Sequence, residues 1–273
     1  MGFEVVADGV LVRTSRRLCT TTSLLLGGSG PHGRGAVLVD PAWEPDELAA
    51  VAAEAREREV GVLAGFATHA HHDHLLWPPG LAGPVPRWAT ATTARIARRE
   101  RARLLAEAGQ DAARYGGRPP TPEMLDLLGR VDALPAGATA VPDPLGLLPR
   151  VEVVEHDAHA PGHAALWLPG PHVLLAGDML SDVEPPLVLD EITGTGGLGG
   201  YRAGLETLAP YAARASVVVP GHGTPTARGA ERLDADRRYL DAVAAGREPD
   251  DVRLGTPDGR AAYEELCSAL RGG

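Results

Sequence analysis

The chain has 273 residues, enough for one large or two small domains, and its 44% hydrophobic and 23% charged residues are ordinary for a globular protein. The net charge of −10 argues against nucleic-acid binding as the main task, and the absence of lysine excludes a lysine nucleophile. With no signal-like segment and no long apolar run, we predict a cytoplasmic protein without a membrane span.

The first part of the chain reads as short strands separated by glycine-rich turns, at residues 3–6, 9–13, 20–26 and 36–39. Residues 45–59 are predicted to form a helix because Leu48, Val51, Ala52 and Ala55 recur at helical spacing. A short buried strand over residues 62–67 follows.

The remainder mixes helices and strands. We predict helices at residues 90–108, 121–128, 200–213, 227–245 and 257–270, and strands at residues 150–155, 164–168, 173–176 and 216–219. Strands interleaved with helices on this scale indicate an α/β fold in which helices cover sheets. We expect residues 1–273 to form a single domain.

Residues 68–74 read Thr-His-Ala-His-His-Asp-His and contain the pattern H-x-H-x-D-H at His69, His71, Asp73 and His74. Imidazoles and a carboxylate packed this densely lose solvation and crowd one another. A divalent metal compensates for that cost, since imidazole and carboxylate are among its usual ligands. The alternative is a polar loop that is rich in histidine by chance.

Four further polar positions follow predicted strands or lie between them. Asp40 closes an early strand, His163 follows Gly162, Asp178 follows Gly177, and His222 follows Gly221. Glycine permits the sharp turns that aim such side chains at a shared centre.

Together these motifs resemble those of the metallo-β-lactamase fold superfamily. The resemblance extends from Asp40 to His222 and implies a four-layer αββα sandwich, here with a helical insertion around residues 90–130. It implies that His69, His71 and His163 hold one metal ion, that Asp73, His74 and His222 hold another, and that Asp178 bridges the two. Asp40 would support a ligand without binding metal itself.

The implied cofactors are two divalent ions, with zinc expected and iron or manganese as alternatives. The resemblance implies a hydrolase in which a hydroxide bridging the metals attacks the substrate, with Asp73 also orienting the nucleophile. Cys19 and Cys267 lie outside every metal motif, so we expect free thiols, with a disulfide as the alternative.

We expect a small-molecule substrate and no nucleic-acid or membrane partner; the oligomeric state is left open. Leu75, Leu76 and Trp77 beside the ligand cluster suggest an apolar pocket wall, which favours a carboxylic ester, lactone or thioester. The alternatives are a phosphodiester or a β-lactam as substrate, an iron-dependent oxidoreductase on the same fold, or a non-catalytic binding protein, against which the intact ligand set argues.

Several other features are left in the background. His72 is expected to point away from the metals, and His156 and His159 are interpreted as surface residues, with a place at the rim of the site or behind a ligand as the alternative. The arginine-bearing stretch from Arg95 to Arg103 is interpreted as a solvated helix face, with a phosphate clamp as the alternative. The glycine-rich segment 193–200 lacks a P-loop lysine and is interpreted as a connector near the site. Trp77, Trp88 and Tyr201 fit either the pocket or the core.

Overall fold

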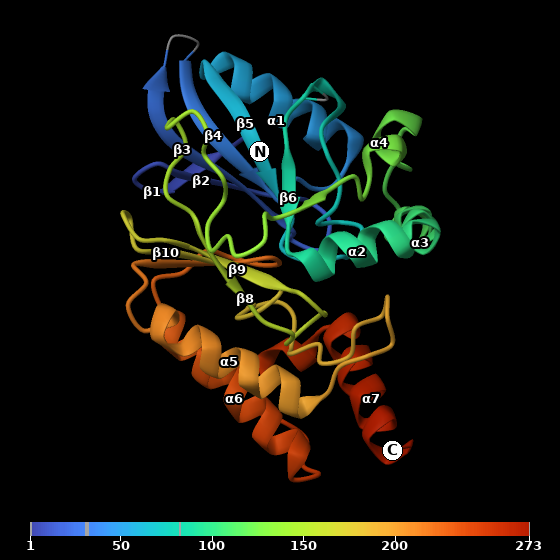
Figure 1. Cartoon of the computed structure of the whole chain (residues 1–273). Helices are drawn as coiled ribbons and strands as arrows, with labels where there is room; N and C mark the ends of the chain where they lie inside the picture. The colour runs from blue at the N-terminus through green and yellow to red at the C-terminus, as the bar shows by residue number, and fades with distance from the viewer. Residues whose placement is uncertain (1, 31–32, 82, 273) are drawn as a thin grey trace.

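The protein is described by a computed structural model that covers residues 2–30, 33–81 and 83–272. Two β-sheets lie face to face at its centre (Figure 1). The first sheet has seven strands in the order of the chain, β1 to β7; the second has four, in the order β11-β10-β9-β8.

The strands of the first sheet are β1 (Glu4–Ala7), β2 (Val10–Thr14), β3 (Thr21–Gly30), β4 (Gly33–Val39), β5 (Val60–Phe66), β6 (Arg87–Ala89) and β7 (Asp132–Ala133). Strands β1 to β4 pair antiparallel, whereas β4 to β7 pair parallel. The second sheet contains β8 (Glu152–Glu155), β9 (Ala164–Leu168), β10 (Val173–Gly177) and β11 (Val217–Pro220), with β10 and β11 parallel.

Alternation along the strands divides the apolar side chains between two faces of each sheet. Leu25 of β3 and Val37 of β4 face the second sheet, where they share a core with Leu166 and Leu175. Their neighbours face outward, and Leu24 and Leu38 pack against helix α1 (Pro45–Glu57). The first sheet therefore contributes to two cores, one on each side.

Helices form the outer two layers. Helix α1 begins at Pro45, after a capping box made by Glu44 and Glu47. The second sheet is covered on its outer face by α5 (Leu198–Ala212) and α6 (Gly229–Ala244), whose core residues include Tyr201 and Leu240. Two 3₁₀ turns, η1 (Pro79–Leu81) and η2 (Val252–Gly255), and the C-terminal helix α7 (Pro257–Gly272) complete this arrangement. The predicted αββα sandwich is confirmed.

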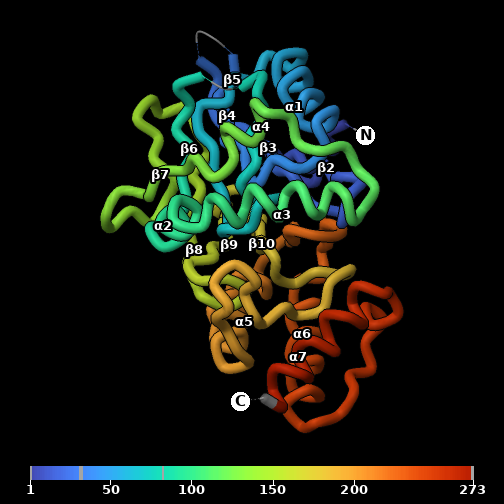
Figure 2. Tube along the Cα trace, turned by 90° about the vertical axis from the view of Figure 1, so that its right-hand side faces the viewer, coloured from blue at the N-terminus to red at the C-terminus, as the bar shows by residue number. Residues whose placement is uncertain are grey.

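The helical insertion lies between β6 and β7. It consists of α2 (Ala91–Arg99), α3 (Arg101–Arg114) and α4 (Pro122–Leu127), which run across the side of the molecule that faces the viewer in Figure 2. The predicted single helix over residues 90–108 is wrong, since the chain leaves helical geometry at Glu100 and α3 continues to Arg114. Arg101 anchors the redirected helix by donating to the carbonyls of Leu125 and Asp126.

The large aromatic side chains that fitted either pocket or core belong to the core. Trp77 and Tyr201 are 3% and 1% exposed, and Trp88 packs partly buried against the core between the sheets. No helix within the described ranges has the length and apolar character needed to cross a membrane.

Candidate metal centre

The polar motifs converge because they follow strands that end at one edge of the two sheets. The 68–74 segment follows β5, Asp178 follows β10, and His222 follows β11. Gly177 and Gly221 leave room for this close approach: a Cβ on Gly177, where φ is +56°, would lie 2.4 Å from His163 Nε2, and one on Gly221 would lie 1.9 Å from Asp178 Oδ1.

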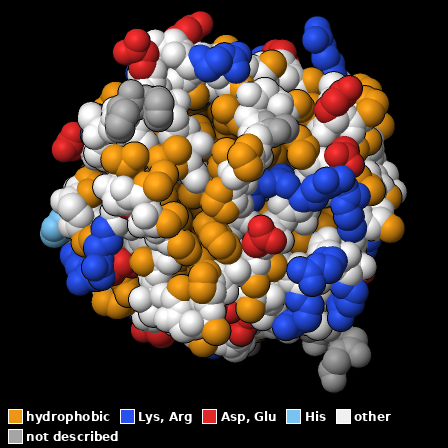
Figure 3. All heavy atoms as spheres, turned by 45° about the horizontal axis from the view of Figure 1, so that its top comes forward, with side chains coloured by type: hydrophobic (Ala, Val, Ile, Leu, Met, Phe, Trp, Pro, Cys, Tyr) orange, Lys and Arg blue, Asp and Glu red, His pale blue; other side chains and the backbone are white. Residues whose placement is uncertain are grey.

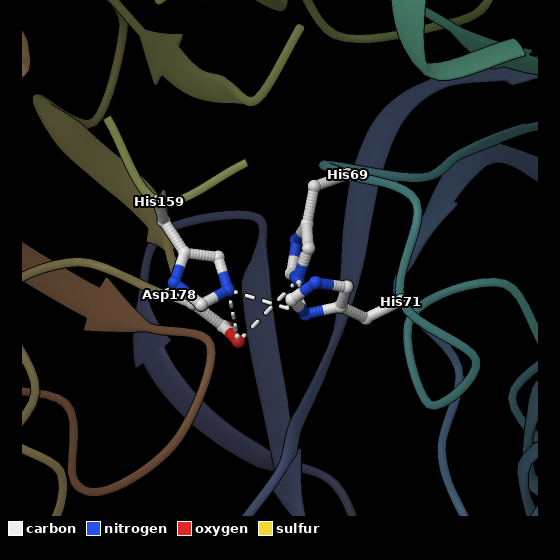
Figure 4. A group of neighbouring side chains, drawn as sticks. All are labelled: His69, His71, His159 and Asp178. Atoms are coloured by element: carbon white, nitrogen blue, oxygen red, sulfur yellow. Dashed lines mark hydrogen bonds and ion pairs between the residues drawn. The ribbon is translucent and has the colours of Figure 1, made fainter. Parts of the chain in front are cut away.

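One group of potential ligands consists of His69, His71, His159 and Asp178. The side chains come from three separate segments and point toward one another (Figure 4). His71 Nδ1 lies 3.0 Å from His69 Nε2 and 3.2 Å from His159 Nε2. Asp178 Oδ2 lies 3.4 Å from His69 Nε2 and 3.5 Å from His159 Nε2.

A second group consists of Asp73, His74 and His222. His222 Nε2 lies 3.2 Å from both His74 Nε2 and Asp73 Oδ2. Behind this group, Asp40 Oδ2 lies 3.0 Å from His74 Nδ1 and also accepts a hydrogen bond from the Thr68 hydroxyl. Asp40 therefore orients His74 from behind, in the supporting position expected from the sequence.

Asp178 lies between the two groups. Its Oδ1 lies 3.2 Å from His74 Nε2, whereas its Oδ2 lies 3.4 Å from His222 Nε2 in addition to its contacts with the first group. The side chain is 5% exposed, and Oδ1 has no hydrogen-bond partner among the described residues. A buried carboxylate oxygen without a donor is costly unless a cation neutralises it.

In the first group of potential ligands, His159 stands where the sequence motif predicts His163. The ring of His163 is buried and stacks on that of His69, but its Nε2 accepts a hydrogen bond from the Asp178 backbone N–H at 3.1 Å. Its Nδ1 faces His156 at 3.2 Å. Both histidines are thus beside the centre, with His159 directed into the first group.

The interpretation of His156 and His159 as surface residues is wrong. They are 8% and 2% exposed. The segment 156–163 folds back so that His156 N donates to the His163 carbonyl, which draws both rings inward. A histidine three residues before the Gly162-His163 motif is the signal that could have placed His159 at the centre.

Asp190 is a supporting residue that the sequence did not reveal. Its Oδ1 lies 2.8 Å from His71 Nε2, which leaves His71 Nδ1 directed at the first group. Thr193 N donates to Asp190 Oδ2 at 2.7 Å, so the glycine-rich segment 193–200 wraps around this carboxylate. The segment 193–200 therefore positions Asp190, which in turn orients the candidate ligand His71.

The electrostatics of the centre differ between the two groups. Burial lowers the pKa of His159 to about 4, and burial together with the charge on His74 holds the pKa of His69 well below its usual value. In the same group burial opposes charge on His71, but the hydrogen bond to Asp190 and nearby carboxylates outweigh it and raise the pKa of His71. Burial acts against charge on His74 as well, but the carboxylates of Asp178, Asp73 and Asp40 outweigh it and raise its pKa well above the usual value. The second group therefore attracts positive charge strongly.

For Asp73 and Asp178, burial would favour the neutral acid, but nearby His74 and His222 outweigh it and hold both pKa values well below the usual range. Buried carboxylates that stay ionised beside inward-facing imidazole nitrogens form a donor set suited to divalent metals. With Asp178 Oδ1 also lacking a donor, the residues fit two metal ions, one in each group.

A cavity of about 290 Å³ opens onto the centre. Its lining includes His71, Asp73, His159, Asp178 and His222 from the two groups, and apolar side chains of Leu18, Trp43, Val183, Pro185, Leu187 and Leu189. The predicted apolar wall of Leu75, Leu76 and Trp77 is wrong: these side chains are at most 3% exposed and pack into the cores beside the site. The apolar surface comes instead from Leu18, Trp43 and the apolar side chains of the segment 183–189.

The arginine-bearing helix face does not line this cavity. Arg95, Arg98 and Arg99 are exposed, and Arg103 pairs with Glu107 one turn later. The interpretation as a solvated face therefore fits the structure. Cys19 and Cys267 are both free thiols, as expected.

The fold is shared with known structures. A beta-lactamase domain protein from Burkholderia ambifaria is 23% identical, with a TM-score of 0.58, and the match covers 97% of this chain and 87% of that one. A metallo-beta-lactamase family protein from Thermus thermophilus is 22% identical, with a TM-score of 0.63 and coverage of 97% and 93%. A sec-alkylsulfatase from Pseudomonas sp. is 19% identical, with a TM-score of 0.62 and coverage of 90% and 42%.

At these identities the structural likeness concerns the fold alone. A comparison with curated proteins gave no match. The family model described as the metallo-beta-lactamase superfamily matches residues 16–222, which is well over half of the chain. The protein therefore belongs to the metallo-beta-lactamase superfamily.

Proposed function

We propose that the protein is a dinuclear metal-dependent hydrolase. The observation that carries this proposal is the position of Asp178, whose two oxygens approach imidazole nitrogens of both ligand groups. We propose zinc as the metal, with iron or manganese as alternatives, because imidazole and carboxylate ligands alone do not discriminate between them.

The proposed ligands are His69, His71 and either His159 or His163 for one ion, and Asp73, His74 and His222 for the other. Asp178 is proposed as the ligand that the two ions would share. When bound, two divalent ions would polarise the scissile bond and make water a nucleophile at neutral pH. The chain's own groups prepare the site for this chemistry: Asp190 and Asp40 fix the rings of His71 and His74. Asp73, which stays ionised, is proposed to accept a hydrogen bond from the attacking water and so orient it.

We propose a carboxylic ester, lactone or thioester as the substrate. A cavity of about 290 Å³ suits a small molecule better than a polymer, and its apolar segment 183–189 suits an acyl chain or a ring. The acidic net charge of −10 would slow the approach of a polyanion, which disfavours a nucleic-acid substrate.

A substrate panel on one metal-loaded preparation tests this proposal. Short-chain aryl esters, a γ-lactone and an acyl thioester are compared with a bis-aryl phosphodiester, a β-lactam and a sec-alkyl sulfate, and oxygen consumption is recorded in parallel. We expect the acyl compounds to exceed the others by at least tenfold in kcat/KM, or about 1.4 kcal/mol in transition-state binding. Turnover of the phosphodiester, sulfate or lactam as the best substrate, or oxygen consumption, would replace the acyl assignment.

Asp178→Asn provides the matched control for metal dependence. The amide keeps the shape of the side chain but removes the charge between the two groups, so we expect less bound metal and lower activity together. Wild-type metal content and turnover in this variant would rule out the role that we propose for Asp178.

A further inference from the structure

The cavity that opens onto the metal centre is lined asymmetrically by charged side chains. Besides the proposed ligands, five carboxylates and one guanidinium line it: Asp111, Glu184, Glu191, Asp258, Glu265 and Arg114. The guanidinium is not free to offset them, since Arg114 Nη2 lies 3.4 Å from Asp258 Oδ1. Arginine side chains, by contrast, gather in groups on the face of the molecule shown in Figure 3.

Asp111 of α3 is the acidic residue with the most specific surroundings. Its side chain is 27% exposed, and the basic nitrogen nearest to it within 4 Å is His72 Nε2, at 3.5 Å from Asp111 Oδ2. That distance is too long for a good hydrogen bond. Burial and the negative charge on Asp73 raise the pKa of Asp111, although the charges on His72 and Arg114 oppose this shift. Within the described residues, Asp111 therefore has no positive partner within 4 Å other than the poorly placed His72.

His72 supplies an independent indication at the same place. The ring lines the cavity, is 3% exposed, and packs edge-on against Trp43 with ring centres 5.1 Å apart. Neither ring nitrogen has a hydrogen-bond partner among the described residues. A buried polar group without a hydrogen-bond partner is costly. A bound ligand that supplies the missing hydrogen bond would remove this cost.

The groups around this position are acceptors rather than donors. Glu191 lines the cavity, and Glu107 Oε2 is buried without a hydrogen-bond partner among the described residues. In the described part of the chain, Asp111, Glu107 and Glu191 do not bring three ligand atoms close enough together to hold a metal ion. A spread of carboxylates around an imidazole fits a group that carries several N–H donors, such as an ammonium.

We propose that the wall formed by His72 and Asp111 is a subsite for a positively charged amine of the substrate. The inference rests on the proposed function: the substrate would be a small ester, lactone or thioester that carries a primary ammonium group away from the scissile carbonyl. The ammonium donates to Asp111 and compensates the negative lining of the cavity. A substrate with a carboxylate or sulfate at that position would be repelled.

Three esters that differ only at one end test the charge preference. Pentyl acetate is neutral, 5-aminopentyl acetate is cationic, and 5-acetoxypentanoate is anionic; their hydrolysis by the metal-loaded protein is followed by acid release. We expect kcat/KM to be at least tenfold higher for the cationic than for the neutral ester, and lower still for the anionic one. Raising the salt concentration should reduce the preference only partly, because the subsite is half-buried.

Asp111→Asn should reduce the ratio between the cationic and neutral esters to threefold or less. A loss of structure would lower both rates alike, so the ratio reports the subsite specifically. Glu264→Gln on α7 is the matched control, since Glu264 is exposed and does not line the cavity. It should leave the ratio unchanged.

A binding measurement keeps this inference separate from the proposed reaction. By calorimetry, pentylammonium should bind the metal-loaded protein more tightly than pentanol, and Asp111→Asn should remove the difference. If no ester is hydrolysed but this difference is found, the proposed hydrolase function fails and the subsite stands. If pentylammonium binds no better than pentanol, or if Asp111→Asn keeps the preference, the subsite is refuted even when hydrolysis occurs.

Discussion

Asp190 Oδ1 lies 2.8 Å from His71 Nε2, although the two residues are 119 positions apart in the chain. The contact fixes which nitrogen of His71 is directed into the candidate centre, because the Nε2 proton is held by Asp190 and Nδ1 remains an acceptor. Thr193 holds Asp190 in turn. The segment 190–193 contributes no candidate ligand itself, but it orients the candidate ligand His71.

Asp190→Asn should weaken metal binding in the first group by about 10–100-fold, the usual effect of removing a carboxylate that orients a histidine ligand. Competition with a chromogenic chelator measures the affinity. Asp234→Asn, at an exposed position of α6, serves as the control and should bind metal like the wild type. Unchanged affinity in Asp190→Asn would mean that His71 does not depend on this contact.

His159→Ala and His163→Ala distinguish the two candidates for the first group. His159 Nε2 faces His71 at 3.2 Å, whereas His163 Nε2 accepts from Asp178 N–H. From these contacts we expect His159→Ala to lose one of the two metal ions and His163→Ala to retain both with lower affinity. Elemental analysis after dialysis against a fixed concentration of zinc gives the answer. The opposite result would restore the assignment that the sequence motif implies.

The two groups should lose metal at different pH values. The pKa of His74 is raised well above 6.5, as is that of His222 through Glu184 and Asp178, although burial opposes both shifts. Each ring must release a proton before Nε2 can bind a cation, so affinity falls as the pH decreases. In the first group, burial lowers the pKa of His159 to about 4 and holds that of His69 well below its usual value. The pKa of His71 alone is raised there, because the hydrogen bond to Asp190 outweighs burial, so fewer rings of the first group must release a proton.

After dialysis against one low concentration of free zinc at pH 8, 7 and 6, metal analysis should therefore show that bound zinc falls from about two ions per chain to about one as the pH decreases. Calorimetry in buffers of different ionisation enthalpy should show proton release on binding of the second ion. Simultaneous loss of both ions over the same pH range would contradict this difference between the groups.

Arg253 of η2 should contribute strongly to stability. It is 5% exposed, and its guanidinium donates to Asp236 at 2.6 Å and to the carbonyls of Ser181 and Glu184 at 3.0 and 3.1 Å. Arg253→Ala leaves Asp236 buried without its partner, which typically costs about 3–5 kcal/mol in the free energy of unfolding. Urea denaturation of the metal-free protein measures the loss.

Arg202→Ala is the matched control for that substitution, because Arg202 pairs with Asp241 at the surface. Exposed pairs contribute about 0–1 kcal/mol, so the two variants should differ clearly. Similar midpoints for both would show that the buried network around Arg253 is not a major source of stability.

Much of the fold could be predicted from local patterns. Adjacent apolar residues such as Leu24 and Leu25 point to opposite sides of a strand and indicate that both faces are buried. Leu48, Val51 and Ala55 recur at helical spacing and indicate one buried helix face. The break at Glu100 could not be predicted, since helical periodicity continues through it and the redirection depends on contacts between Arg101 and α4. Tertiary contacts decided the outcome there.

In the candidate site, too, local motifs could be predicted from the sequence, whereas positions set by tertiary contacts could not. The dense motif predicted that His69, His71, Asp73 and His74 lie together, and the glycine-flanked positions predicted the same for Asp178 and His222. Strand ends at one edge of the sheets bring these residues together. His159 and Asp190 were missed since neither lies in a dense motif, and their positions depend on how loops fold back. Leu75 to Trp77 were misplaced because proximity in sequence to a ligand does not determine which side of the loop faces the cavity.

The candidate metal ligands lie mostly at the ends of the central strands, whereas the cavity beside them is lined by α3 from the insertion and by the C-terminal helix α7. Substitutions in those two helices can alter the shape and charge of the entrance without moving a strand. Under the proposed function, the choice of substrate could therefore change through these helices while the candidate metal centre is retained. Exchange of α3 and α7 between relatives would be a rational route to new substrate ranges on an unchanged sandwich.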